Sequence, residues 1–366
     1  MCDQVGAALA HKFGPRYREK GLNNMLKPGE QPVVICTGAT HFCIQRAAGM
    51  LGIGVDNVIP IEGDDAFSMR LDLLKEALDQ NSCVVCVVAN AGSTTTGAID
   101  PIDDIANLCE ERNIWLHVDA AYGGSALMSP ELKPLFKGIE RADSVTMDLH
   151  KWFFMAYDCS AIVYKDPSIV KTLFDEQSDI VKQLSLDTFS NSHLFFHLGP
   201  ELSRRARALP VYIAFQHYGM ERLGRNVLYH VKCTKYFAEC IEYDPNFELV
   251  SAPLLSICTF RMVPQGLTSN YGESYGEEKK NEEYVDETKL IDDLNKHITD
   301  RIEKEGNYFI SPTKVKGRPV LRICVVNLYS RAKDLDGLLE TINRIGKQWI
   351  QENVPASMNK SAIGAM

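Results

Sequence analysis

The stretch Ile114-Trp-Leu-His-Val-Asp-Ala-Ala-Tyr-Gly-Gly124 is the clearest guide to the fold of this chain. Its first five residues form an apolar run typical of a buried strand, and a carboxylate and several small residues follow directly. Similar apolar runs alternate with segments of helical periodicity through the first half of the chain. The runs lie at 33–36, 57–61, 83–89, 144–147 and 160–164, and the helical segments at 41–51, 70–78 and 102–112. This alternation predicts an α/β fold, with a mostly parallel sheet and helices on both faces.

Side chains that can take part in catalysis or ligand binding follow three of these predicted strands. Asp119 follows the quoted run, Lys151 lies in Asp148-Leu-His-Lys-Trp152, and His41 ends Thr37-Gly-Ala-Thr-His41. Each one alone has an ordinary explanation as a helix cap, a turn residue or a surface charge. In a parallel sheet, however, ligands bind beyond the carboxyl ends of the strands. Together the three suit pyridoxal 5′-phosphate (PLP): the amine bonds to its aldehyde, the carboxylate pairs with its pyridine nitrogen, and the imidazole stacks on its ring.

The second half of the chain has a different pattern. The 366 residues suffice for a large and a small domain, and we expect a cofactor-binding domain at 1–210 and a C-terminal domain at 211–366. The smaller one is predicted to be α/β, with a polar surface loop at 265–283. Its predicted helices are 211–243, 288–305 and 334–351, and its strands lie within 247–261 and 320–326.

Charge and cysteine content exclude several classes of function. The net charge of −9 argues against nucleic acid or an anionic membrane as the main partner. Cys83 and Cys86 have metal-ligand spacing, but in a strand they point to opposite faces, so no metal site is predicted. The 11 cysteines are expected to be reduced thiols of a cytoplasmic protein. No apolar stretch has membrane-spanning length, and the first residues do not form a signal peptide.

Several longer motifs carry a resemblance to a known family. They are 91–100, 113–125, 138–144, 148–154, 158–161 and 203–209. In this order they resemble the group II PLP-dependent amino-acid decarboxylases, which include the aromatic-L-amino-acid, tyrosine, glutamate, cysteine-sulfinate and diaminobutyrate decarboxylases. The resemblance covers about residues 30–350. It implies a fold-type I PLP-dependent transferase-like fold and a homodimer with its active site at the subunit interface.

The resemblance also implies roles for individual residues. Lys151 carries the cofactor, and Asp119 holds its pyridine nitrogen. Ala121 packs on one face of the ring. His41 stacks on the other face and contacts the carboxylate of the substrate, which makes Lys151 and His41 the expected catalytic residues.

The remaining implied contacts concern the periphery of the cofactor. Ser93 and Thr94 lie near the ring hydroxyl and the substrate, and His150 contacts the phosphate. The family's Gly-rich Ser-Asn phosphate motif is missing from Met1 to Ala10, so we expect an N-terminally short chain that retains PLP weakly. Asp148 occupies a position where several relatives have asparagine near the phosphate.

The expected activity is decarboxylation of an L-amino acid to the amine and CO2. Tyr122, where glutamate-type relatives usually have tryptophan, favours an aromatic or diaminobutyrate substrate. The stretch 176–196 contains no tyrosine, although the aromatic branch carries a proton-donating tyrosine on a loop here. Its phenylalanines, Phe189, Phe195 and Phe196, leave open an aldehyde synthase, which also removes the amino group oxidatively. The sequence is also compatible with a catalytically impaired, truncated family member and with an α/β protein that binds no cofactor.

Overall fold

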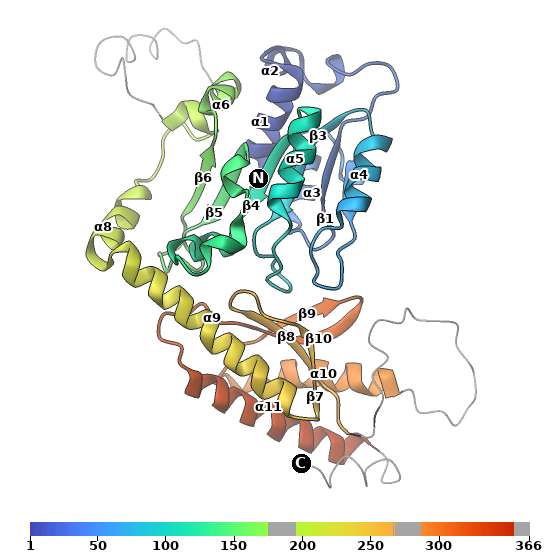
Figure 1. Cartoon of the computed structure of the whole chain (residues 1–366), viewed down its shortest axis with the longest axis vertical. Helices are drawn as coiled ribbons and strands as arrows, with labels where there is room; N and C mark the ends of the chain where they lie inside the picture. The colour runs from blue at the N-terminus through green and yellow to red at the C-terminus, as the bar shows by residue number, and fades with distance from the viewer. Residues whose placement is uncertain (175–194, 266, 268–286, 355–366) are drawn as a thin grey trace, which may run out of the picture. The chain divides into compact units, whose positions relative to one another are not determined.

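The computed structural model describes residues 1–174, 195–265, 267 and 287–354 (Figure 1). The chain divides into two compact units. The first comprises Met1–Thr94 and Ile99–Gly224, and the second comprises Thr95–Ala98 and Arg225–Met366. The predicted stretch 176–196 lies almost entirely outside the described residues, as does most of the predicted loop 265–283.

The first unit is built on a six-stranded sheet in the order β2-β1-β3-β4-β5-β6. The first five strands in that order run parallel, and β6 pairs antiparallel with β5. The strands are β1 (Val33–Thr37), β2 (Val58–Ile61), β3 (Val84–Asn90), β4 (Trp115–Asp119), β5 (Ser144–Asp148) and β6 (Ser160–Tyr164). Every residue of β1, β3 and β4 is buried, which explains why these strands read as continuous apolar runs.

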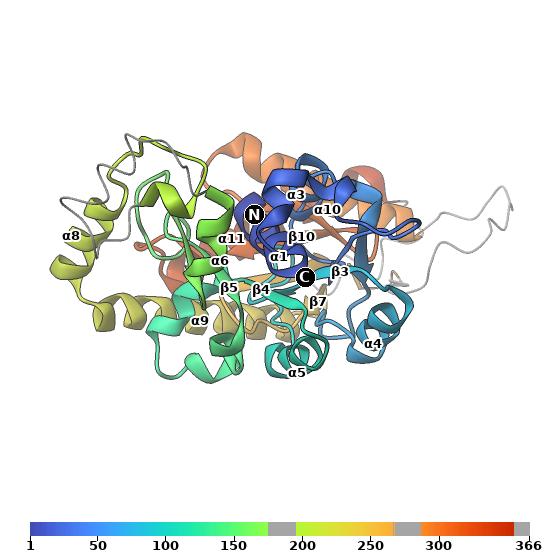
Figure 2. The same cartoon turned by 90° about the horizontal axis from the view of Figure 1, so that it is seen from above.

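Helices cover both faces of this sheet (Figure 2). Helices α1, α3 and α6 lie on one face, and α4 and α5 lie on the other. The α-helices of the unit are α1 (Cys2–Phe13), α2 (Arg16–Lys20), α3 (Cys43–Met50), α4 (Leu71–Gln80), α5 (Ile102–Arg112), α6 (Pro167–Phe174) and α8 (Ala208–Tyr218). The 3₁₀ helices are η1 (Leu22–Asn24), η2 (Val55–Asn57), η3 (Gly123–Met128), η4 (Lys133–Phe136), η5 (Ile139–Arg141) and η6 (Phe195–Leu198). The predicted α/β fold, mostly parallel with helices on both faces, is confirmed.

The second unit contains a four-stranded antiparallel sheet in the order β7-β8-β10-β9. Its strands are β7 (Phe247–Ser251), β8 (Ile257–Met262), β9 (Ser311–Val315) and β10 (Arg318–Cys324). Helices α10 (Glu287–Glu305) and α11 (Ala332–Asn353) pack together, and α10 packs on the sheet. Apolar side chains of α9 (Met220–Tyr243), α10, α11 and the sheet form one buried core.

One predicted helix proved to be two. The sequence pattern predicts a single helix over 211–243, but α8 ends at Tyr218 and α9 begins at Met220. Gly219 between them has a positive φ of 75°, a conformation that glycine adopts without the steric cost of a Cβ atom. The boundary between the two units falls within the first residues of α9.

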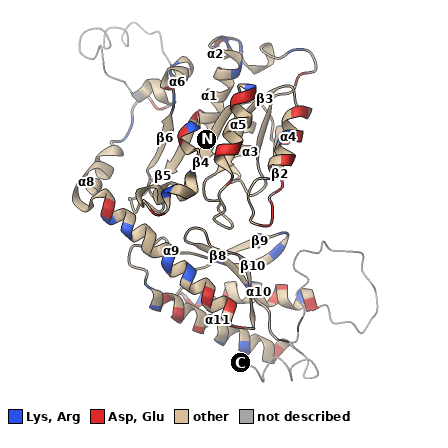
Figure 3. Cartoon of the chain, viewed as in Figure 1, with Lys and Arg blue, Asp and Glu red and all other residues tan. Residues whose placement is uncertain are grey.

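Charged side chains are distributed unevenly over the helices. Figure 3 shows acidic and basic residues interspersed along α9 and α11, as expected for solvated helix faces, whereas α8 carries none. Leu209, Tyr212 and Ile213 of α8 are all more than half exposed.

Within the described residues, no helix is both long and apolar enough to cross a membrane.

Candidate active site

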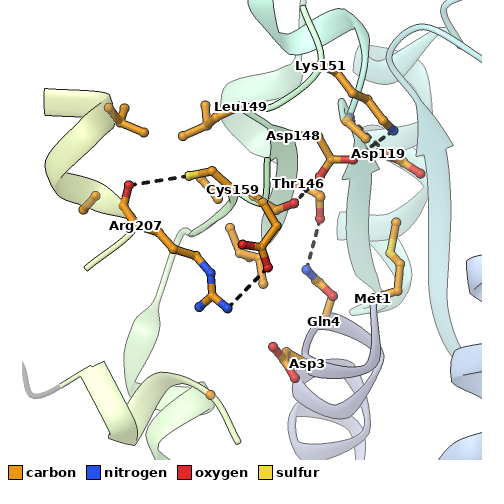
Figure 4. Close-up of a pocket in the computed structure, with 18 of the residues that line it drawn as sticks. Met1, Asp3, Gln4, Asp119, Thr146, Asp148, Leu149, Lys151, Cys159 and Arg207 are labelled. Atoms are coloured by element: carbon orange, nitrogen blue, oxygen red, sulfur yellow. Dashed lines mark hydrogen bonds and ion pairs between the residues drawn. The ribbon is translucent and has the colours of Figure 1, made fainter. Parts of the chain in front are cut away.

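A cavity of about 1390 Å³ lies in the first unit, at the carboxyl ends of its parallel strands (Figure 4). The register of the sheet places Asn90, Asp119 and Thr146 side by side at this edge. Among the residues that line the cavity are six of the predicted site residues, namely His41, Ser93, Thr94, Asp119, Ala121 and Lys151. The fold therefore brings together side chains that are up to 110 positions apart in the sequence.

Asp119 ends β4 and is almost fully buried, with 8 % of its surface exposed. Its Oδ1 accepts a hydrogen bond of 3.1 Å from the backbone N–H of Ala121. Burial raises the pKa of this carboxyl group, while the Ala121 N–H and the charge of Lys151 oppose the rise. A second cation bound in the cavity would therefore stabilise the carboxylate form.

Lys151 lies in the turn that follows β5, which is closed by a bond from its N–H to the carbonyl of Asp148. Its side chain is 40 % exposed, and its Nζ lies 2.8 Å from Oδ2 of Asp148 (Figure 4). The other oxygen of Asp148 accepts a bond of 2.6 Å from the Ser160 hydroxyl of the neighbouring strand. The amine is thus accessible from the cavity and held by a carboxylate.

His41 lies in the loop between β1 and α3. Its Nδ1 accepts a hydrogen bond of 3.3 Å from the N–H of Cys43, and its ring lies 4.1 Å from that of Phe42, centroid to centroid. Burial lowers the pKa of His41, and the positive charge of Lys151 lowers it further. The imidazole is accordingly neutral at pH 7 and suited to stack on an aromatic ligand.

A buried carboxylate fixes the loop that carries Ser93 and Thr94. Asp100 accepts hydrogen bonds from the Thr37 hydroxyl at 2.5 Å and from the N–H groups of Asn90 and Met69 at 2.6 and 2.8 Å. Burial raises the pKa of Asp100 to about 6, and these hydrogen bonds oppose the rise. Asp100 ends the motif 91–100, but nothing in the sequence pattern indicates that it joins the ends of β1 and β3.

His150 is the predicted site residue that is not among the described residues lining the cavity. Its Nδ1 accepts a bond of 3.0 Å from the N–H of Cys159, and its ring lies 4.2 Å from the ring of Tyr157. The contact of His150 with the cofactor phosphate stays a prediction.

The arginines of the cavity were not assigned a role from the sequence. Arg205 pairs with Asp158 at 3.0 Å, and Arg207 pairs with Glu201 at 3.0 Å. The motif 203–209 contains both arginines but did not indicate their partners. Tyr122 lines the cavity and stacks on Trp152, with ring centroids 5.1 Å apart and planes 9° apart.

A buried polar network supports the floor of the cavity. Gln4 of α1 donates a bond of 3.0 Å to the hydroxyl of Thr146, next to Asp119 in the sheet (Figure 4). Behind them, Ser144 bonds to Trp115 Nε1 and to His117 Nδ1, both at 2.9 Å. Burial lowers the pKa of His117 to about 3, so its imidazole is neutral at pH 7.

Comparison with solved structures defines the class of the fold. The crystal structure of mouse CSAD superimposes with a TM-score of 0.80 at 26 % identity, over 94 % of this chain and 69 % of that one. A structure of Oryza sativa TDC with PLP and tryptamine gives the same TM-score at 22 % identity, over 95 % of this chain and 69 % of that one. The fold is that of the fold-type I decarboxylases.

Sequence comparison then identifies the family. The profile of the pyridoxal-dependent decarboxylase conserved domain matches residues 5–263, and the chain belongs to this family. The chain is 28 % identical over 335 residues to an aromatic-L-amino-acid decarboxylase of Bacillus atrophaeus, covering 90 % of this chain and 65 % of that protein. It is 30 % identical over 318 residues to a phenylacetaldehyde synthase of Arabidopsis thaliana, covering 84 % and 60 %. The chain thus spans less than two thirds of the length of these relatives.

The side chains of the cavity fit the reactive part of the family's cofactor. The exposed amine of Lys151 matches an aldehyde, and the buried Asp119 matches a protonated pyridine nitrogen. The neutral imidazole of His41 matches the ring face.

Proposed function

We propose that this chain is a PLP-dependent decarboxylase of L-amino acids and that Lys151 carries the cofactor. The observation that supports this most strongly is the meeting of Lys151, Asp119 and His41 at one cavity in the first unit. The family membership supports the same reaction class. When bound, the cofactor supplies an aldehyde and a conjugated ring that takes up the electrons left behind by CO2.

The residues of the chain have distinct tasks in this proposal. Lys151 provides the nitrogen that bonds to the aldehyde carbon. The Asp119 carboxylate, whose burial disfavours it without a cation, pairs with the protonated ring nitrogen. His41 and Ala121 would hold the ring from its two faces, and Ser93 and Thr94 would contact its hydroxyl and the substrate.

An aromatic amino acid is the proposed substrate. Tyr122 is held by its stack on Trp152, and apolar side chains of β6 and α8, including Ile162, Tyr212 and Phe215, line the same cavity. An apolar wall of this kind suits an aromatic side chain. Two of the relatives named here, an aromatic-L-amino-acid decarboxylase and a phenylacetaldehyde synthase, support it too.

The second candidate is an aromatic aldehyde synthase. The 30 % identity to a phenylacetaldehyde synthase and the absence of tyrosine from the stretch 176–196 favour it. A decarboxylase releases CO2 and an amine, whereas an aldehyde synthase consumes O2 and water and releases CO2, ammonia, hydrogen peroxide and an aldehyde. Quantifying amine and ammonia per CO2 therefore decides between them.

The test of the proposed function uses the purified chain with added PLP. Borohydride reduction and peptide mapping should place a pyridoxyl group on Lys151. CO2 release should then be measured with L-phenylalanine, L-tyrosine, L-tryptophan, L-2,4-diaminobutyrate and L-glutamate. A label on another lysine would refute the assignment of Lys151, and a labelled chain that decarboxylates none of these substrates would refute the proposed activity.

The assembly and compartment are proposals as well. The exposed, uncharged α8 beside the cavity supports a homodimer with the site at its interface, because exposed apolar patches mark interaction surfaces. Sedimentation with PLP present tests it, and a fully active monomer would refute it. The 11 free cysteines support a reducing, cytoplasmic location, which cell fractionation tests.

A further inference from the structure

Both oxygens of the Asp148 carboxylate have partners at the cavity wall. One lies 2.8 Å from Nζ of Lys151, and the other accepts the bond from Ser160. The side chain of Asp148 is 17 % exposed. Burial acts to raise the pKa of Asp148, but the hydrogen bonds from Lys151 and Ser160, together with the charge of Lys151, hold it below its usual range, so the group is charged at neutral pH. A fixed negative charge therefore lies directly beside the reactive amine.

The structure of PLP brings its phosphate close to this charge. The aldehyde and the phosphate arm are attached to neighbouring carbons of the pyridine ring. A ligand whose aldehyde carbon bonds to Lys151 must therefore place its phosphate within a few ångströms of the same nitrogen. Asp148 lies 2.8 Å from that nitrogen, so a phosphate attached this way would lie close enough to the carboxylate for the two charges to interact.

The arginines Arg205 and Arg207 at the cavity have carboxylate partners of their own. They are engaged with Asp158 and Glu201, and Arg204, which also lines the cavity, pairs with Glu201 at 3.3 Å. Near Lys151, the carboxylate of Asp119 adds to that of Asp148, and both act on the pKa of His41 together with Lys151. Two carboxylates thus lie near one ammonium group where the aldehyde has to bind.

We propose that Asp148 is a specificity-determining residue of the cofactor site, and that it disfavours the phosphorylated aldehyde relative to the unphosphorylated one. This inference rests on the proposed function, because it takes Lys151 as the point of attachment. Like charges a few ångströms apart in a partly buried site repel by energies that correspond to about a tenfold to hundredfold change in affinity. The site would consequently exchange PLP more readily than the same site without this carboxylate.

The experiment compares PLP with pyridoxal, which has the same aldehyde and ring but no phosphate. In both cases Nζ of Lys151 forms a double bond to the aldehyde carbon, and the carbonyl oxygen leaves as water. Borohydride then adds hydride to that carbon, and the label on Lys151 is measured by mass spectrometry over a range of probe concentrations. The ratio of the two half-saturation concentrations cancels every effect that the probes share, including the ion pair with Lys151.

Three variants test whether the charge of Asp148 sets this ratio. Asp148→Asn removes the charge but keeps the size and an oxygen that accepts from Ser160, and it should favour PLP over pyridoxal by about tenfold to hundredfold more than the unchanged chain does. Asp148→Glu keeps the charge and should leave the ratio near its original value. Asp166→Asn removes a carboxylate that caps α6 away from the cavity lining, and should also leave it unchanged.

The outcomes separate the two proposals. If neither probe labels Lys151 in the unchanged chain, the proposed function fails. If both label it but Asp148→Asn shifts their affinities equally, the selective role of Asp148 fails while the attachment site stands. Equal ratios for Asp148→Glu and Asp148→Asn would mean that shape, not charge, matters, and would also overturn the inference. Far-UV circular dichroism confirms that each variant is folded before it is compared.

Discussion

Each unit of this protein holds an acidic and a basic side chain in contact, but the two pairs are built differently. In the first unit Lys151 contacts Asp148 and is 40 % exposed to the cavity. In the second unit Arg261 contacts Asp292, and the arginine side chain is 1 % exposed. Beside this second pair, the Asn295 amide bonds to both backbone groups of Met262, which joins α10 to β8.

The difference shows what an ion pair contributes in each setting. Burial lowers the pKa of Arg261 and Asp292 opposes that shift, so the carboxylate compensates for the cost of burying the guanidinium charge in the core. Lys151 keeps one side open, and its nitrogen is available to a ligand. We therefore expect changes in the enclosed pair to affect stability and changes around the open pair to affect chemistry.

The largest expected effect comes from removing the open amine. Lys151→Ala should abolish the pyridoxyl label and lower CO2 release by about a thousandfold or more, since the proposed function assigns the covalent bond to this amine. The free energy of unfolding should change by less than about 1 kcal/mol, as is usual for exposed side chains. Lys133→Ala, at an exposed position of η4, is the control. Retained labelling in Lys151→Ala would show that the cofactor attaches elsewhere and would contradict the functional role given to the open pair.

The enclosed pair should behave in the opposite way. Asp292→Ala leaves Arg261 buried without its carboxylate and should destabilise the second unit by about 3–5 kcal/mol. Hydrogen exchange of peptides from β8 and α10 measures this loss, and labelling of Lys151 by PLP should persist where the chain is folded. Asp293→Ala is a matched control, because Asp293 is exposed on the same helix. A similar loss of stability in both variants would show that the contact between Asp292 and Arg261 is not the source of the effect.

We expect Asp119 to affect chemistry more than stability, although it is buried like the enclosed pair. Asp119→Asn should lower kcat/KM by about a hundredfold to a thousandfold, as when one preorganised electrostatic partner is lost. Its stability should stay the same or rise, because the burial that raises the pKa of this carboxyl disfavours its charged form. Near-normal turnover would contradict its role, and Asp104→Asn on the exposed face of α5 controls for the loss of charge.

The smallest effect concerns the support beneath the open site. His117 has a folded-state pKa of about 3, below the usual 6.5, so the unfolded chain binds the proton more tightly. Its contribution to stability is complete above pH 6.5 and declines as the pH falls from 6.5 towards 3, by about 2 kcal/mol at pH 5. His117→Asn should remove this part of the pH dependence.

The measurement can be restricted to the first unit. Trp349→Phe leaves Trp115 and Trp152, which both belong to the first unit, as the fluorescent probes of urea unfolding. The pH dependence of stability is compared between the Trp349→Phe protein with His117 and the same protein with His117→Asn. Asp100 and Asp119 titrate in both proteins, so the difference between the two pH slopes is due to His117. Equal slopes with and without His117 would show that it is not held neutral by the core.

The sequence predicted most of the first unit because its elements are locally determined. Strands buried on both faces give continuous apolar runs, and amphipathic helices between them give a clear periodicity, as in β3, β4 and α5. The second unit was predicted less completely, because β9 (Ser311–Val315) was not predicted and one predicted strand-like stretch, 247–261, covers both β7 and β8, of which β8 extends to Met262. The break at Gly219 was missed because the helical pattern continues through a single glycine whose φ is set by the surrounding chain.

By itself, the sequence determined the α/β class, the family and the strand ends that carry Lys151, Asp119 and His41, because local patterns and ordered motifs specify them. Only the tertiary structure showed that Asp148 holds the amine of Lys151, that Asp100 joins the ends of β1 and β3, and that His150 bonds to Cys159 beside the cavity. These contacts depend on where side chains point once the strands are in register. The spacing of residues along a chain fixes which face of a strand a side chain occupies, but not which distant partner it meets there.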